Sequence, residues 1–156
     1  MIATQRCCFV LWGDQCDEAA AVLIVTAMRA AGLRVWVVGM SGKRIGGLYG
    51  LQLVADLALD EALPLADQAA CVVVPCPIEL LGRFLHDPRL RIFLETATVQ
   101  ETPLLMAQSA AMTHTADLLS EIGLYIVPEL TIIYPAGEEL LPFIRSFATK
   151  LSESLS

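Results

Sequence analysis

Residues 6–39, RCCFVLWGDQCDEAAAVLIVTAMRAAGLRVWVVG, decide the fold. Arg6–Trp12 is a short apolar run rich in strand-forming residues, which is typical of a strand buried on both faces. Asp17 is a good N-cap for the alanine-rich stretch Glu18–Ala31, which predicts a helix. Arg34–Gly39 predicts a second buried strand. A strand, a helix and a strand within about 35 residues form a βαβ unit, whose two strands must be parallel.

The rest of the chain continues this alternation. Residues Gly42–Gly50 hold four of the ten glycines and predict a small hairpin or excursion. Further core strands are predicted at Cys71–Val74, Leu104–Ala107 and Leu130–Ile133, and helices at Ile78–Leu85, Pro88–Thr96, Ser109–Glu121 and Gly137–Leu151. The sequence therefore predicts a single α/β domain over residues 1–156: a three-layer, flavodoxin-like, doubly wound and mostly parallel sheet.

The composition is unusually apolar for a chain of 156 residues. Hydrophobic residues make up 56% and charged residues 17%, and the mean hydropathy is +0.62. A second copy that covers part of this apolar surface would explain the excess, so we expect a homodimer. No apolar run reaches the roughly 20 residues of a membrane helix, and the N-terminus lacks a signal-peptide pattern. We expect a cytoplasmic protein without a membrane partner.

Charge and cysteine usage exclude further classes. The formal net charge is −7, and the ten basic residues are scattered, which argues against nucleic acid as a partner. The five cysteines are odd in number and form no CxxC pair, so neither a disulfide framework nor a zinc site is expected. The sequence indicates no cofactor and no metal.

Ligands of doubly wound sheets bind at the carboxyl ends of the strands. In this chain those ends fall at residues 13–17, 41–47, 75–78, 107–111 and 134–138. Lys43 and Arg44 among their glycines could hold an anion, although the pattern is not GxGxxG and an ordinary excursion explains it equally.

Three nucleophile or acid–base candidates lie in or near these loops. Ser109 could be a nucleophile, but a serine there also suits a helix N-cap. Cys76 precedes a helix whose N-terminus would lower the pKa of its thiol, and the alternative is a packed loop cysteine. His114 could pair with Asp117 or Glu121 on one helix face, or simply belong to a solvated face.

Several segments resemble the ThiJ/PfpI superfamily, which includes the Parkinson-disease-associated deglycase/chaperone and the PfpI-type intracellular proteases. The segments that carry the resemblance are Met28–Val35 with Val38-Gly39 and Ser41-Gly42-Lys43, then Asp56–Glu61, Cys71–Pro75, Pro103–Ala111 and Ile132–Gly137. Their order and spacing cover nearly the whole chain. The resemblance implies a sheet flanked by helices on both faces.

The resemblance also implies a mechanism. A cysteine on a strand-to-helix elbow attacks a carbonyl, a glutamate from the first helix hydrogen-bonds its thiolate, and backbone amides of a glycine pair bind the oxyanion. In this chain Ser109 stands at the cysteine position, Cys76-Pro77 replaces the glycine pair, and the glutamate position falls on Ala20 or, with a two-residue shift, on Glu18. Proline has no amide hydrogen to donate.

These departures together predict a catalytically degenerate protein that acts as a dimeric binding, scaffold or regulatory module. The first alternative is a hydrolase, amidase or glyoxalase-type enzyme with a relocated nucleophile, Cys76 or Ser109, and Glu18 as its acidic partner. The second is a sensor of a small molecule or anion that uses residues 41–47.

Overall fold

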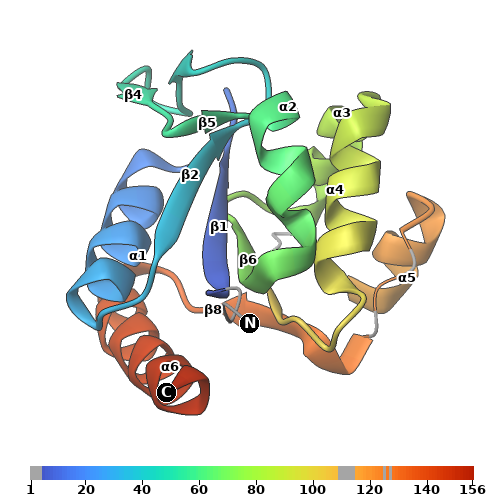
Figure 1. Cartoon of the computed structure of the whole chain (residues 1–156). Coiled ribbons are helices and arrows are strands. Elements are labelled where there is room, and N and C mark those ends of the chain that lie inside the picture. The colour runs from blue at the N-terminus through green and yellow to red at the C-terminus, as the bar shows by residue number, and fades with distance from the viewer. Residues whose placement is uncertain (1–4, 109–114, 125, 127) are drawn as a thin grey trace.

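The computed structural model describes residues 5–108, 115–124, 126 and 128–156, and shows two layers of helices around one sheet (Figure 1). The strands are β1 Cys7–Trp12, β2 Val35–Gly39, β3 Arg44–Gly46, β4 Gln52–Val54, β5 Leu57–Ala58, β6 Ala69–Val74, β7 Leu104–Ala107 and β8 Thr131–Tyr134. The helices are α1 Glu18–Ala30, α2 Leu59–Ala62, α3 Ile78–Phe84, α4 Pro88–Thr98, α5 Thr115–Glu121 and α6 Leu140–Leu155, with 3-10 turns at Leu63–Gln68, Pro128–Leu130 and Gly137–Glu139.

The main sheet has six strands in the order β5-β2-β1-β6-β7-β8. Every adjacent pair in it is parallel. The strand order changes direction at β1, between β2 and β6, which is where doubly wound sheets place their ligand crevice. The predicted three-layer α/β/α fold is confirmed.

The two central strands are buried on both faces. All six residues of β1 and all six of β6 are buried. Along β1, Phe9 and Leu11 point to the face covered by α2, α3, α4 and α5, whereas Cys8 and Val10 point to the face covered by α1 and α6. The alternation explains why this stretch is a continuous apolar run instead of a polar–apolar pattern.

The α1 helix begins at the predicted residue and ends one residue before the predicted Ala31. Asp17 is the N-cap, and its carboxylate accepts a hydrogen bond from the Ala20 amide at 3.2 Å. At the other end Gly32 has φ +86°, the left-handed geometry that glycine adopts without a Cβ clash. Buried Ile24 and Met28 pack this helix against the sheet and α6.

The glycine-rich excursion is an antiparallel hairpin of β3 and β4 outside the main sheet. The indole N–H of Trp12, at the end of β1, donates a 2.9 Å hydrogen bond to the Ile45 carbonyl and fixes the hairpin over the sheet. Gly39 is required nearby, since a Cβ there would lie 1.7 Å from the Gly42 carbonyl oxygen. In the described part of the chain no helix is long and apolar enough to span a bilayer.

Candidate functional site

The candidate site lies at the carboxyl ends of β1, β6 and β8, beside the strand-order reversal. Residues 13–17 follow β1 and residues 75–77 follow β6. The Asp17 amide donates a 2.9 Å hydrogen bond to the Pro75 carbonyl, which joins these two segments directly. Cys16 precedes Asp17 and Cys76 follows Pro75, so this bond brings together two cysteines from distant parts of the chain.

Glu18 opens α1 and is the one acidic residue that is buried in the described chain, with 5% exposure. Its carboxylate accepts hydrogen bonds from the backbone amides of Tyr49, at 2.9 and 3.1 Å, and Leu51, at 2.9 Å. Burial raises the pKa of this carboxyl, but the Tyr49 and Leu51 amides favour the ionised form and leave the pKa below its ordinary value. Glu18 is therefore a structural anion that holds the hairpin loop against α1.

Gly47 makes this contact possible. A Cβ at Gly47 would lie 2.6 Å from the Glu18 carboxyl carbon and 2.7 Å from the Cys16 carbonyl oxygen. The Leu48 amide also donates to that Cys16 carbonyl, at 2.9 Å. The loop thus approaches the start of α1 too closely for any side chain at position 47.

Cys76 is 1% exposed, and Cys16, which is 0% exposed, donates its thiol to the Leu11 carbonyl at 3.9 Å. Interaction with the Cys16 thiol, burial and the nearby charge of Glu79 raise the pKa of Cys76 far above the ordinary thiol value. Sequence analysis weighed a reactive thiol against a packed loop cysteine, and this setting favours the packed cysteine, because the N-terminus of the short α3 does not outweigh a thiol neighbour and an apolar setting. Cys76 is a protonated, enclosed thiol.

The segment of Cys76 and Pro77 offers no donor to an oxyanion. The Cys76 amide donates a 2.8 Å hydrogen bond to the Val74 carbonyl. Pro77, which precedes α3, has no amide hydrogen. An oxyanion hole needs amides that point at the developing charge, and neither residue supplies one.

Tyr134 ends β8 at the same edge of the sheet, and sequence reasoning did not single out its side chain. It is 3% exposed, and its hydroxyl has no hydrogen-bond partner within the described residues. Burial raises the pKa of this hydroxyl, so it stays protonated.

The structure brings together only part of the predicted site. Glu18 and Cys76 lie at the same edge, but the hydrogen bonds of the carboxylate go to the hairpin loop, and Cys76 is enclosed beside Cys16. Ala20, the other candidate for the glutamate position, is 6% exposed and packs in the core beneath α1 and α6. Ser109 and His114 lie outside the described residues.

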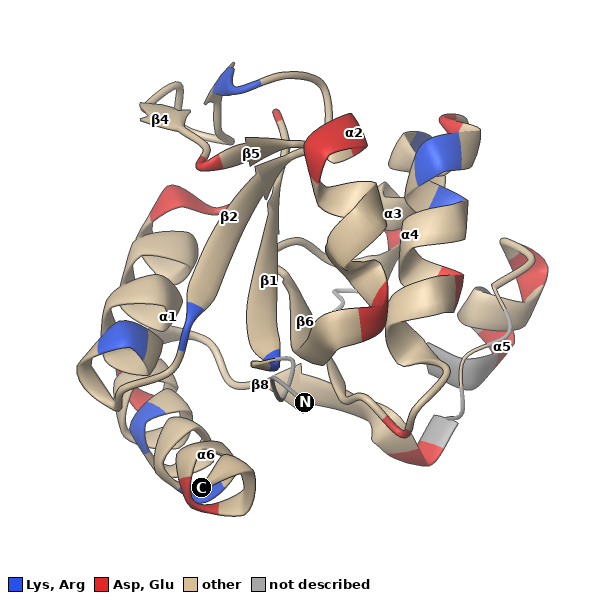
Figure 2. Ribbon diagram, viewed as in Figure 1, with Lys and Arg blue, Asp and Glu red and all other residues tan. Residues whose placement is uncertain are grey.

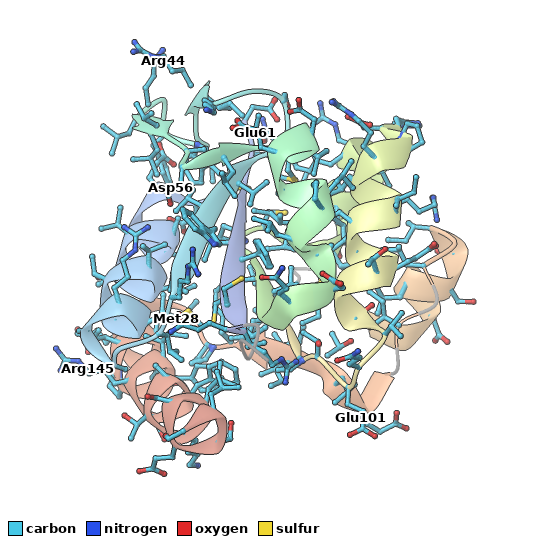
Figure 3. All side chains as sticks on the ribbon, in the orientation of Figure 1. Met28, Arg44, Asp56, Glu61, Glu101 and Arg145 are labelled. Carbon is cyan, nitrogen blue, oxygen red and sulfur yellow. The ribbon has the colours of Figure 1, made fainter. Side chains whose placement is uncertain are left out.

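Lys43, a candidate anion ligand in the glycine-rich loop, already has an acidic partner. Lys43 Nζ lies 2.9 Å from the Glu61 carboxylate of α2. Figure 3 labels Glu61 beside α2 and shows the labelled Arg44 extending away from the fold. On the other side of the hairpin, Asp56 accepts from Arg29 at 2.9 Å and from the Val37 amide at 2.8 Å. The acidic segment after the hairpin therefore anchors β2 and the hairpin.

Comparison with known proteins identifies the fold. No family model matches the sequence, and no curated protein matches it at a significant level. Solved structures do match. A DJ-1 superfamily protein from Salmonella typhimurium has TM-score 0.66 and 17% identity, and the match covers 97% of this chain and 90% of the Salmonella chain. Drosophila melanogaster DJ-1beta has TM-score 0.66 and 16% identity, with the same coverage.

A third similar structure is the putative protease I from Bacteroides thetaiotaomicron, with TM-score 0.65 and 13% identity over 97% of this chain and 99% of that one. These similarities extend over whole chains and agree with the sheet order and the paired helix layers described above. The chain therefore has the fold of the DJ-1/ThiJ/PfpI superfamily.

Proposed function

We propose that this chain is a divergent, catalytically inactive member of the DJ-1/ThiJ/PfpI superfamily that acts as a dimeric binding or regulatory module. The observation that carries the proposal is the segment after β6, where Cys76 is enclosed, its amide is bonded to Val74, and Pro77 has no amide hydrogen. A fold hosts many functions, so the function of this chain depends on the residues of this site and not on its relatives.

Acyl-transfer chemistry at this edge would need an ionised nucleophile and an oxyanion hole. The raised pKa of Cys76 opposes the first requirement. Glu18 is occupied by the hairpin loop and is not placed to tune a thiolate at Cys76. The function that remains favoured is binding of a ligand or a partner without turnover.

Turnover assays test the inactive state. Ester, amide and methylglyoxal substrates would be offered to the wild type and to Cys76→Ala, Ser109→Ala and Glu18→Gln, with Cys71→Ala as a control that removes a buried thiol of β6 instead. We expect the wild type to show no rate above the variants. Robust turnover that one of the three site variants abolishes, while Cys71→Ala keeps it, would overturn the proposal.

An exposed apolar face supports the homodimer. It comprises Leu48, Tyr49, Leu51 and Val54 of the hairpin with Val22 of α1, and Tyr49 and Val54 are 80% and 68% exposed. Between the hairpin and α1 lies an apolar groove of about 180 Å³ that includes Val22, Val25 and Val54. A second copy of the same face is the proposed occupant, since it offers a matching set of apolar side chains.

Sedimentation velocity over a range of concentrations tests the dimer. We expect the wild type to sediment as a dimer and Val54→Glu to shift it toward monomer, because a charge would be buried in the interface. The control is Val99→Glu, which changes a residue that is 76% exposed after α4, outside the proposed face. A monomeric wild type, or equal effects of the two variants, would contradict the proposed dimer.

A further inference from the structure

The loop between β3 and β4 is held by its backbone and leaves its side chains free. The Glu18 carboxylate accepts hydrogen bonds from the Tyr49 and Leu51 amides. The Cys16 carbonyl accepts another from the Leu48 amide at 2.9 Å. Each of these contacts uses a backbone amide, and the side chains of all three loop residues are exposed. The loop therefore presents apolar side chains from a fixed position.

Tyr49 is the most prominent of these side chains. It is 80% exposed, the highest value for any large hydrophobic residue in the described part of the chain. Tyrosine is common among the residues that dominate binding energies, because its ring buries a large area and loses little conformational freedom. A loop that is already ordered also lowers the entropic cost of binding. Tyr49 therefore has the properties of an interface anchor.

The apolar groove beside α1 is the matching hollow. It is bordered by Val22, Val25 and Thr26 of α1 and by Leu53 and Val54 of β4. Its volume of about 180 Å³ lies below the roughly 300–1,000 Å³ typical of small-molecule sites. The groove therefore suits a single inserted side chain better than a separate ligand.

The chemistry of the groove favours a tyrosine. Thr26 is the one polar residue among the described residues that line it. The Thr26 hydroxyl donates to the Val22 carbonyl at 2.7 Å, so its oxygen keeps acceptor capacity while its hydrogen is already used. Apolar walls with one acceptor match a side chain that has an apolar ring and one hydroxyl donor.

No charge interrupts the surface between the loop and the groove. Residues 19–28 and 45–55 contain no Asp, Glu, Lys or Arg. Figure 2 shows α1 without a charged residue between its acidic start and its basic last turn. Charged residues are depleted at the cores of protein interfaces, because burying a charge is costly. Two copies can therefore bring these surfaces together without removing a charge from water.

The loop and the groove are neighbours along α1. The loop is tied to Glu18 in the first turn, and Thr26 lies eight residues further on, about 12 Å along the helix axis. A two-fold axis between them would place the Tyr49 ring of each copy in the groove of the other, as an isologous dimer requires. A single copy does not make this contact, since its own Tyr49 is exposed.

We propose that Tyr49 is the anchor of the dimer. Its ring enters the groove of the second copy, and its hydroxyl donates to the partner's Thr26. Glu18 is the positioning residue that holds the loop, and hence the ring, in the orientation for docking. The inference rests on the proposed dimer and adds the contact that holds the two copies together.

Sedimentation equilibrium over a series of concentrations measures the dissociation constant of the dimer. Tyr49→Ala should raise this constant by about 30-fold or more, the size of effect that marks a hot-spot residue. The control Ile92→Ala changes an exposed apolar residue of α4 and should leave the constant unchanged. A wild type that is monomeric throughout would overturn the dimer and the anchor together. A wild-type dimer that Tyr49→Ala leaves intact would overturn the anchor alone.

A double-mutant cycle tests the contact between the two hydroxyls. Tyr49→Phe and Thr26→Val should each raise the dissociation constant by about 3- to 10-fold, the effect of losing a hydrogen bond. The double variant should be no weaker than the weaker single variant, because both changes remove the same bond. Effects that multiply would show that the two hydroxyls do not meet and would overturn the assigned contact.

A second cycle tests the positioning role of Glu18. Glu18→Gln should weaken the wild-type dimer but have a smaller effect in the Tyr49→Ala background, because a positioning residue acts through the side chain that it positions. Equal weakening in both backgrounds would contradict that role. Circular dichroism checks that each variant is folded. Tyr49→Ala and Tyr49→Phe change only an exposed side chain, so they keep the anchor falsifiable if Glu18→Gln unfolds.

Discussion

The carboxylate of Glu18 accepts a 2.9 Å hydrogen bond from the backbone amide of Leu51, across 33 positions of sequence. This bond, with those from Tyr49, ties the first turn of α1 to the loop between β3 and β4. It explains how an acidic residue at the carboxyl edge of the sheet can be buried without a basic partner.

The first prediction concerns the pH dependence of stability. The folded-state pKa of Glu18 lies below its ordinary value of 4.5, so the unfolded chain binds the proton more tightly than the folded chain does. The stabilisation that the ionised Glu18 carboxylate gives to the folded state is therefore fully present above pH 4.5. It is lost as the pH falls through the lower folded-state pKa. Urea unfolding between pH 6 and pH 3 should show a steeper loss of stability for the wild type than for Glu18→Gln.

Glu153→Gln is the matched control for that experiment, since Glu153 is exposed near the end of α6. It should follow the wild-type pH profile. Equal pH profiles for Glu18→Gln and the wild type would show that the Glu18 carboxylate is not held in its charged form by the Tyr49 and Leu51 amides. Amide exchange at Tyr49 and Leu51 should also be faster in Glu18→Gln.

The second prediction concerns the space at Gly47. Gly47→Ala would place a Cβ 2.6 Å from the Glu18 carboxylate and 2.7 Å from a backbone carbonyl, so the loop must move. Overpacking of this kind costs about 1–3 kcal/mol of unfolding free energy. Gly46→Ala is the control, because the nearest atom to its Cβ would be 3.6 Å away, an ordinary contact. A Gly47→Ala protein as stable as Gly46→Ala would show that the loop does not press against Glu18.

The third prediction concerns the core under α4. Phe93 is 0% exposed and packs edge to face on Phe9 of β1, with ring centroids 5.2 Å apart. Phe93→Ala should lower the free energy of unfolding by about 3–5 kcal/mol because it removes a buried ring and leaves a cavity. Its neighbour Ile92 is 56% exposed, and Ile92→Ala should change stability by only about 0.5 kcal/mol. Chemical denaturation measures both, and similar losses for the two would contradict the assigned helix face.

Much of the fold could be predicted from local pattern. The run Arg6–Trp12 was recognisable as a buried strand because both faces of a central parallel strand are apolar, and Asp17 with Gly32 marked the two ends of α1. The β5 strand and α2 were missed. The β5 strand, Leu57–Ala58, has two residues, too few to show a period, and only its pairing with β2 makes it a strand.

The site was less predictable because its determinants are distant in sequence. Nothing near Glu18 indicates that its partners are backbone amides more than 30 positions away. The helix that follows Cys76 left a reactive thiol and a packed loop cysteine both open, and nothing near Cys76 in sequence indicates that Cys16, 60 positions earlier, contributes to raising its pKa. Tyr134 carried a weak signal, a polar group at the end of a predicted strand, which could have been followed.

The fourth prediction tests the central claim, that the cysteine at the carboxyl edge of the sheet is an enclosed, protonated thiol. The measurement is the rate of iodoacetamide labelling of Cys76 in the native protein between pH 6 and pH 8, with peptide mapping by mass spectrometry and Cys76→Ala as the control for assignment. Because Cys76 is 1% exposed and its pKa is raised, we expect labelling far slower than that of a free thiol, becoming fast only in denaturant. Rapid, stoichiometric labelling of native Cys76 below pH 8 would contradict the account and restore an enzymatic role for this residue.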